Sequence, residues 1–268
     1  MTRLKDFSGH NVLITGASSG IGRLLALEMA ARGARIALVA RRRDALDGVA
    51  EEIKAEGGSA VALVCDVGDR EQALATAALA IEELGPIDVL VNNAGFGRHR
   101  RFLDHELEDM ERMMRVNFLG SLYFTKALLP AMVERGLGWI VFIASVAGRI
   151  APADETAYAA SKFAMVGLAS SLSLEVEDAG VHVLTVCPGA IRTPFFDDEA
   201  LARLPAVAHR QMAEPEGLVG AIMDALARGK RELTYPRWIS SGYIAQALAP
   251  GFTRRQVKKQ TLVEPDEK

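Results

Sequence analysis

The sequence is poor in cysteine, with only Cys65 and Cys187 among its 268 residues. Each of them closes a short apolar run, at residues 60–64 and 181–186, so both are predicted to lie at buried strand ends. Two thiols placed in this way do not form a disulfide framework, which excludes the small secreted domains that depend on one. We expect both cysteines to be reduced.

Long apolar runs and an excess of one charge are also missing. No segment approaches the ~20 uninterrupted apolar residues of a membrane-spanning helix, and residues 1–8 lead to the first apolar run without the hydrophobic region of a secretory signal. The net charge of −3 and the pI near 6.0 give no general attraction to nucleic acid or to an anionic membrane. We therefore expect a soluble, cytoplasmic protein, and any such partner would need a local patch.

Metal-binding patterns and internal repeats are missing as well. The five histidines have no H-E-x-x-H or other ligand spacing, so no metal site is expected. The chain contains no low-complexity tract and no linker that would separate a second domain.

Short apolar runs alternate with longer helical patterns along most of the chain. The runs, rich in Val, Ile and Leu, predict strands at residues 11–14, 35–40, 60–65, 89–91, 139–144, 181–186 and 232–235. Helical patterns lie between them, near residues 21–32, 43–56, 69–84, 106–135, 155–179 and 215–228. Runs that are apolar at every position suit parallel strands covered on both faces. We predict an α/β fold with a single doubly wound parallel sheet of the Rossmann type and helices on both faces. Residues 1–235 would form this domain, and residues 236–268 a C-terminal extension packed on it.

The first predicted strand runs into the glycine-rich turn Thr15-Gly16-Ala17-Ser18-Ser19-Gly20-Ile21-Gly22, after which a helix begins. Glycines at such a junction let backbone N–H groups and the positive end of the helix approach a pyrophosphate. The spacing differs from the G-x-G-x-x-G fingerprint, and glycine also serves any tight turn. Because the turn opens a series of strand–helix units, we interpret it as a dinucleotide site formed by Gly16, Ser18, Ser19, Gly20, Ile21 and Gly22.

The second predicted strand is followed by three arginines, Arg41, Arg42 and Arg43. In dinucleotide-binding folds, the residue at this position contacts the adenosine ribose. An acid here binds the 2′-hydroxyl of NAD and repels the 2′-phosphate of NADP. Guanidinium groups suit a phosphate dianion, so the sequence favours NADP, with Arg41 as the specific contact because it comes first. The alternative is that the arginines are merely solvated at the start of the next helix, where the helix dipole disfavours cations.

Two further strand ends carry residues suited to a cofactor. Asp66 is placed to accept a hydrogen bond from the adenine amino group while the Val67 backbone donates one; Asp66 is also suited to cap the next helix, and the two roles are compatible. The fourth strand ends in a small, amide-rich loop that contains Asn93, Ala94 and Gly95. Such a loop can lie against a bound cofactor, although an Asn-Gly type of turn also forms without a cofactor.

The fifth predicted strand ends at Ser145, and a helix after the next loop carries Tyr158 and Lys162. Ligand sites in open α/β sheets lie beyond the carboxyl ends of the strands, where Ser145 is expected. A tyrosine and a lysine four residues apart share one helix face. A free phenol, with a pKa of about 10, is a poor base at neutral pH, but a nearby ammonium group favours the phenolate. The pattern predicts a pair that exchanges a proton with a substrate oxygen.

With these motifs in order, the chain resembles the short-chain dehydrogenase/reductases. The resemblance extends over residues 15–193 and rests on Thr15, Gly16, Gly20, Gly22, Asp66, Asn92 to Gly95, Asn117, Ser145, Tyr158, Lys162, Pro188, Gly189 and Thr193. It implies hydride transfer between C4 of a nicotinamide and a carbinol or carbonyl carbon. It also implies a homodimer or homotetramer formed through the long helices near residues 106–135 and 155–179.

The resemblance implies a role for each catalytic residue. Tyr158 would be the general acid/base, Ser145 would hold the reacting oxygen, and Lys162 would lower the pKa of the tyrosine and bind the nicotinamide ribose. Asn117 would hold a water that relays protons to Lys162; its local sequence alone indicates a helix kink or a buried, hydrogen-bonded amide.

The segment after the sixth strand resembles the one that passes the nicotinamide carboxamide in this family. Pro188 and Gly189 would bind the cofactor, the Ile191 backbone would contact that amide, and Thr193 would place a hydroxyl near the pyrophosphate. A Pro-Gly turn that closes a buried strand is compatible with the same sequence.

Three segments outside these motifs each allow more than one role. Residues 194–213 predict either a mobile lid over an apolar substrate or packing against the C-terminal tail, through Phe195, Phe196, Leu201, Leu204, Pro205 and Met212. The basic residues 98–101 indicate a solvated loop or a contact for an acidic substrate group. Residues 236–259, apolar and then basic, suit a pocket wall, an oligomer contact or a membrane-surface helix, in that order.

The sequence thus predicts an NADP(H)-dependent oxidoreductase that acts on the carbonyl or secondary alcohol of a small or medium apolar substrate. One alternative is a redox sensor or scaffold that binds NADP without turnover, which would have no need of Ser145, Tyr158 and Lys162. Another is a nucleotide-sugar epimerase or dehydratase, although such relatives usually have a longer substrate domain than the segment after Thr193.

Overall fold

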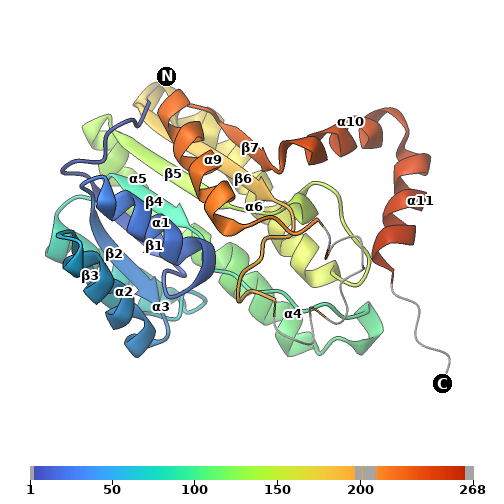
Figure 1. Ribbon diagram of the computed structural model, residues 1–268, viewed down its shortest axis with the longest axis horizontal. Helices are drawn as coiled ribbons and strands as arrows, with labels where there is room; N and C mark the ends of the chain where they lie inside the picture. The colour runs from blue at the N-terminus through green and yellow to red at the C-terminus, as the bar shows by residue number, and fades with distance from the viewer. Residues whose placement is uncertain (1–2, 197–200, 202–208, 210, 263–268) are drawn as a thin grey trace.

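The computed structural model describes residues 3–196, 201, 209 and 211–262. Seven parallel strands form one sheet in the order β3-β2-β1-β4-β5-β6-β7 (Figure 1). The strands are β1 (Asn11–Thr15), β2 (Arg35–Ala40), β3 (Ser59–Val64), β4 (Val89–Asn92), β5 (Gly138–Ile143), β6 (Val181–Pro188) and β7 (Glu232–Tyr235). The predicted α/β fold with one doubly wound sheet is confirmed.

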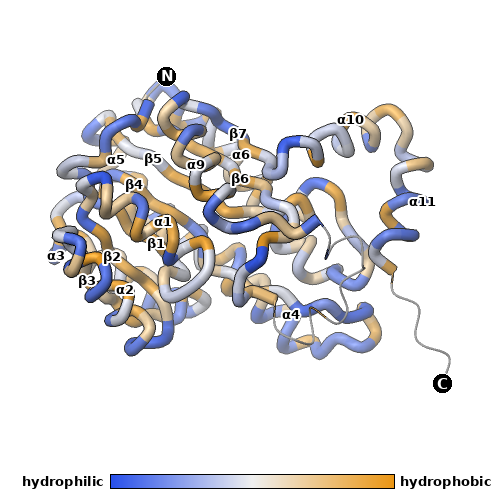
Figure 2. The backbone as a smooth tube through the Cα atoms, viewed as in Figure 1, coloured by the Kyte–Doolittle hydropathy of each residue, from blue (hydrophilic) through white to orange (hydrophobic). Residues whose placement is uncertain are grey.

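Helices cover both faces of the sheet. The main ones are α1 (Gly20–Ala31), α2 (Arg43–Ala55), α3 (Arg70–Leu84), α5 (Gly120–Arg135), α6 (Thr156–Val176) and α9 (Pro215–Arg228). Val12 and Ile14 of β1 belong to a core with α1, α2 and α9, whereas Leu13 belongs to a second core with α3, α5 and α6. Since neighbouring strand residues face opposite layers, the middle of each central strand is apolar on both faces, and Figure 2 shows the central sheet as largely hydrophobic.

The helical stretch between β4 and β5 contains an irregular turn. It consists of α4 (Leu107–Met113), a π-helical turn η2 (Met114–Leu119) and α5. By length and composition alone, residues 107–135 would suffice to cross a membrane, but they pack against α3 and α6 in the position of a core helix. A π-turn inside an α-helix often marks a functional site, and this one carries Asn117.

The chain beyond β7 forms an arm at the end of the sheet (Figure 1). It contains a short helix η5 (Arg237–Ile239), then α10 (Ser240–Leu248) and α11 (Pro250–Thr261), which pack on each other. The arm reaches back to the main body, where the Ala153 backbone N–H donates to the Thr261 hydroxyl at 2.9 Å. We call residues 236–262 the C-terminal arm.

Candidate active site

A cavity of about 1300 Å³ runs along the carboxyl ends of the strands. It exceeds the ~300–1,000 Å³ of ordinary small-molecule pockets and has room for a dinucleotide and a substrate. Most of the residues predicted for the site line it together: Gly16, Ser18, Ser19, Gly20, Ile21, Arg41, Asp66, Val67, Asn93, Ala94, Gly95, Ser145, Tyr158, Lys162, Pro188, Gly189, Ile191 and Thr193. Gly22 and Asn117 do not line it and lie behind its wall.

The glycine-rich turn is built for close backbone approach. Gly16 and Gly20 have φ values of 69° and 55°, in the left-handed region that favours glycine. A Cβ on Gly22 would lie 2.4 Å from both the Gly16 carbonyl oxygen and the Asn93 amide nitrogen. That amide donates to the carbonyl oxygens of Thr15 at 2.9 Å and Gly16 at 3.2 Å. The β4 loop therefore holds the turn in place.

The first turn of α1 is suited to bind an anion. Its N-cap residue, Ser19, makes no side-chain capping bond with a described residue, and the first turn carries no acid. The N–H groups there and the helix dipole favour a phosphate. By contrast α3 is capped by Asp69, whose carboxylate accepts from the Gln72 backbone N–H at 3.0 Å. The prediction that Asp66 caps this helix is therefore wrong, because Asp69 lies nearer its first turn.

Two of the three arginines after β2 face the cavity. Arg41 and Arg42 line it, and the Arg42 guanidinium donates to the Ser18 hydroxyl at 3.2 Å. Arg43 instead pairs with Asp47, one turn along α2, at 2.7 Å. The sequence singled out Arg41, and the structure adds Arg42 as a second guanidinium beside the glycine-rich turn.

Asp66 is held by two donors. Its carboxylate accepts from the Gly68 backbone N–H at 3.0 Å and forms an ion pair with Arg112 of α4. Burial acts to raise the pKa of Asp66, but the Arg112 and Gly68 donors outweigh burial and lower it. Asp66 is therefore a carboxylate at neutral pH. No local pattern marks Arg112, because its partner lies far away in the sequence.

Ser145, Tyr158 and Lys162 meet at one end of the cavity. The Lys162 ammonium donates to the Ile143 carbonyl oxygen at 2.9 Å and lies 5.7 Å from the centre of the Tyr158 ring. The Ser145 hydroxyl accepts from the Ala147 backbone N–H at 3.1 Å. Lys162 is almost fully buried and Tyr158 is half-buried.

Burial dominates the proton affinities of this pair. It raises the pKa of Tyr158, and a hydrogen bond with Ser145 offsets only part of this effect. Burial also lowers the pKa of Lys162 to about 8. The net direction for Tyr158 is opposite to the lowering expected from Lys162, because desolvation disfavours the charged form of both residues. With the protein's own groups around it, Tyr158 is protonated at neutral pH and is poised as an acid.

An aromatic cluster surrounds the tyrosine. The Phe195 ring lies 5.8 Å from the Tyr158 ring and 5.2 Å from the Phe196 ring, on which His99 stacks at 5.7 Å. The His99 Nδ1 atom lies 2.9 Å from a Glu155 carboxylate oxygen at the start of α6. His99 was marked in the sequence only as part of the basic stretch 98–101, and no pattern marks Glu155; the fold alone brings the two together. Of the predicted lid, residues 197–200, 202–208 and 210, which include Leu204 and Pro205, lie outside the described residues.

Asn117 braces the β4 loop from the π-turn. Its amide group donates to the Phe96 carbonyl oxygen at 3.0 Å and to the Ser161 hydroxyl at 2.9 Å, and its oxygen accepts from the Phe96 N–H at 3.0 Å. A Cβ on Gly95 would lie 3.2 Å from the Asn117 oxygen and 3.5 Å from the Lys162 nitrogen. Asn117 is thus a buried, hydrogen-bonded amide close to Lys162, and its role in a water relay stays a prediction.

Comparison with known proteins identifies the family. A family model described as short chain dehydrogenase matches residues 10–203. The chain is a short-chain dehydrogenase/reductase. It is 42% identical to oxidoreductase UcpA of Salmonella typhimurium, over 73% of this chain and 74% of that protein.

Solved structures of the family share the fold. A short-chain dehydrogenase/reductase from Mycobacterium marinum matches with a TM-score of 0.77 and 35% identity, over 86% of this chain and 95% of that one. A metagenomic short-chain oxidoreductase in complex with NADP matches with a TM-score of 0.73 and 31% identity, over 85% and 97% of the two chains. As a short-chain dehydrogenase/reductase, the protein is an oxidoreductase that uses a nicotinamide cofactor.

Proposed function

We propose that this short-chain dehydrogenase/reductase uses NADPH to reduce the carbonyl group of a small or medium apolar substrate, or runs the same reaction in reverse. The observation that carries the proposal is a single cavity with Arg41 and Arg42 at one end and Ser145, Tyr158 and Lys162 at the other. The first group suits a 2′-phosphate, and the second suits a reacting oxygen. The solved NADP complex of a relative supports the cofactor assignment.

The chain's own residues fit the cofactor. The uncapped turn of α1 would hold the pyrophosphate, Asp66 and Val67 the adenine, and Arg41 with Arg42 the 2′-phosphate. Lys162 would contact the nicotinamide ribose, and residues 188–193 would pass the carboxamide. When bound, NADPH supplies a hydride from C4 of its nicotinamide.

The proton comes from the protein. The Tyr158 phenol donates its proton to the carbonyl oxygen as negative charge develops there, and the Ser145 hydroxyl donates a hydrogen bond to the same oxygen. The carbonyl carbon gains the hydride and the oxygen gains the proton, which gives the alcohol. The Lys162 ammonium then stabilises the phenolate until Tyr158 is protonated again.

The wall near the tyrosine defines the substrate class. Its apolar and aromatic part includes Phe96, Ile150, Pro152, Phe195, Phe196, Ile239 and Val257, while polar and charged residues such as His99, Asp154 and Glu155 also line the cavity. Ile239 and Val257 come from the C-terminal arm, which supports the interpretation of that segment as a pocket wall. An apolar carbonyl compound loses its hydration favourably in such surroundings.

Exposed apolar side chains on the two long helices support a homodimer or homotetramer. Val133 of α5 is 41% exposed, and Phe163 and Leu174 of α6 are 43% and 74% exposed. Such residues on neighbouring elements favour an interface between copies of the chain.

Cofactor preference is tested by measuring the Kd of NADPH and NADH for the parent and for three matched variants. Arg41→Asp and Arg42→Asp should each reduce the preference for NADPH by about 10- to 100-fold, since a charged hydrogen bond contributes about 1.5–3 kcal/mol. Arg43→Asp is the control, because Arg43 pairs with Asp47 and lies away from the cavity. Equal affinities of the parent for the two cofactors would contradict the assignment.

The reaction is tested by a panel of apolar ketones and secondary alcohols, with NADPH absorbance and product formation both recorded. One NADPH should be consumed for each alcohol formed. Tight binding of NADPH without turnover of any panel compound would favour the sensor or scaffold instead. Conversion of a nucleotide sugar without net change in NADPH would favour the epimerase.

A further inference from the structure

The C-terminal arm differs in charge from the rest of the protein. From Leu233 to Val263 the sequence contains no Asp or Glu, and the arm carries five cations, Arg237, Arg254, Arg255, Lys258 and Lys259. The acids resume at Glu264, outside the described residues. The chain as a whole has a net charge of −3, so the arm is a local basic segment on an acidic protein.

The same arm exposes large apolar side chains to water. Trp238 is 57% exposed, Ile244 64%, Leu248 82% and Phe252 61%. Ile244 and Leu248 are four residues apart and therefore share one face of α10. Apolar side chains gathered in this way indicate an interaction surface, whereas single exposed ones do not.

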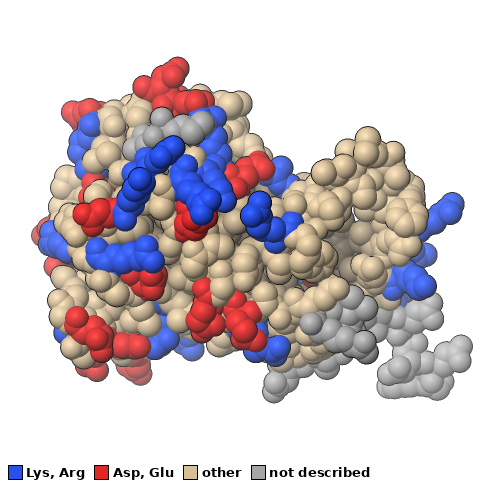
Figure 3. All heavy atoms as spheres, turned by 45° about the horizontal axis from the view of Figure 1, so that its top comes forward, with Lys and Arg blue, Asp and Glu red and all other residues tan. Residues whose placement is uncertain are grey.

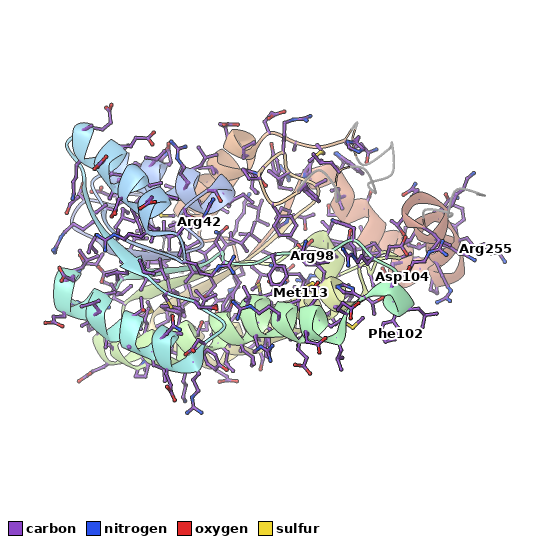
Figure 4. The ribbon with its side chains drawn as sticks, turned by 90° about the horizontal axis from the view of Figure 1, so that it is seen from below. Arg42, Arg98, Phe102, Asp104, Met113 and Arg255 are labelled. Atoms are coloured by element: carbon purple, nitrogen blue, oxygen red, sulfur yellow. The ribbon has the colours of Figure 1, made fainter. Side chains whose placement is uncertain are left out.

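The cations of α11 lie on the side away from the cavity. Val257, Gln260 and Thr261 line the cavity, and at about 100° per residue the four cations of this helix centre on a different face. All four are exposed, and none forms an ion pair with a described residue. Figure 3 shows basic and no acidic side chains over the outer end of the arm, and Figure 4 shows Arg255 pointing away from the body.

A second part of the cavity rim, outside the arm, also exposes large apolar side chains to water. Phe102 and Leu103, in the short helix η1 (Phe102–Asp104), are 60% and 92% exposed. Asp104 lines the cavity, which places η1 at its rim. Phe102, Asp104 and Arg255 lie at the same end of the molecule (Figure 4).

We propose that the C-terminal arm docks the mouth of the cavity onto an anionic lipid bilayer. The exposed apolar side chains enter the headgroup region, while the cations of α11 meet acidic headgroups. Because the arm also forms a wall of the cavity, through Ile239 and Val257, docking brings the cavity to a source of apolar compounds dissolved in the lipid.

Charge selects this occupant over a second copy of the chain. In a two-fold contact that brings the two arms against each other, two sets of five cations would meet without an acid from either arm. A neutral apolar partner would cover Ile244 and Leu248 but leave the cations of α11 unmatched. A surface that is apolar inside and anionic outside matches both features.

The proposal is tested by co-sedimentation of the full chain with vesicles of phosphatidylcholine alone and of phosphatidylcholine mixed equally with phosphatidylglycerol. The parent should bind the mixed vesicles more tightly, and salt should weaken this binding. The variant R255Q/K259Q should bind about 30-fold more weakly, since each cation near an anionic surface contributes about 1 kcal/mol. The matched control K54Q/R70Q loses the same charge from α2 and α3 and should bind as the parent does.

The apolar contribution is tested with I244S/L248S, which should also lose vesicle binding while keeping its urea midpoint. Neither pair of arm substitutions touches the catalytic residues, and vesicle binding requires no turnover, so the result is independent of the proposed reaction. The proposal is overturned if the parent does not bind anionic vesicles or if R255Q/K259Q binds as well as K54Q/R70Q. It is also overturned if the parent does not bind vesicles and I244S/L248S converts a dimer to monomers in sedimentation velocity. The exposed face of α10 would then be an interface between two copies of the chain.

Discussion

Replacing Lys162 with Met should stabilise the protein while abolishing turnover. Burial lowers the pKa of Lys162 from 10.5 to about 8. At about 1.4 kcal/mol per pH unit, keeping this buried amine charged at neutral pH costs about 3 kcal/mol of unfolding free energy. Met fills a similar volume without a charge but loses the hydrogen bond from the charged ammonium to the Ile143 carbonyl oxygen, which contributes about 2 kcal/mol.

The expected net gain is about 1 kcal/mol at pH 7, which corresponds to a rise in Tm of about 2–4 °C for a chain of this size. Urea unfolding of the parent and Lys162→Met, followed by circular dichroism, measures the gain. The unfolded chain keeps the Lys162 proton up to about pH 10.5, whereas the folded chain loses it near pH 8. The parent therefore gains stability as pH rises between these values, and the advantage of the variant should shrink by about 1 kcal/mol between pH 7 and pH 9.

Lys126→Met is the control, because Lys126 is exposed on α5. It should change the unfolding free energy little at either pH. If Lys162→Met destabilises the protein at pH 7, or if its advantage does not depend on pH, the lysine is not held charged against burial. Lys162 would then not be a residue kept for its chemistry at a cost in stability.

Three further substitutions probe the site. Gly22→Ala should destabilise the protein by about 1–3 kcal/mol, because the new Cβ would lie 2.4 Å from a backbone oxygen; an unchanged urea midpoint would count against this packing. Burial is the main reason that the pKa of Tyr158 is raised, and the Glu155 carboxylate adds to it. Glu155→Gln should therefore move the alkaline limb of the ketone-reduction pH profile to lower pH, and an opposite shift would disprove the coupling. Arg112→Met should raise the pKa of Asp66, because burial raises this pKa and Arg112 is the main group that lowers it. An unchanged carboxylate titration by NMR would argue against the ion pair.

The sequence predicted the sheet and the main helices because their patterns are local. Parallel strands covered on both faces leave continuous apolar runs, and the helices between them have a period of their own. The π-turn at residues 114–119 was not predicted as such, because its sequence is as helical as its surroundings. The buried amide of Asn117 was one of two expectations from the local sequence, and its partners Phe96 and Ser161 come from other elements.

The candidate site was predicted where residues follow strand ends and missed where distant side chains meet. Topology alone brings the carboxyl ends of the strands together, so Ser145 and Gly95 could be placed without coordinates. Arg112 and His99 gained their partners only through tertiary packing. The direction of the Tyr158 pKa was also out of reach, since it depends on how much water the folded chain excludes.

The most direct test of the account is the Tyr158→Phe variant, assayed with NADPH and an apolar ketone that the parent reduces. Phe keeps the ring that packs on Phe195 and removes only the proposed proton donor. The Kd of NADPH should stay close to that of the parent, and turnover should fall by about 100- to 10,000-fold. Turnover near the parental rate would contradict the assignment of Tyr158 as the general acid.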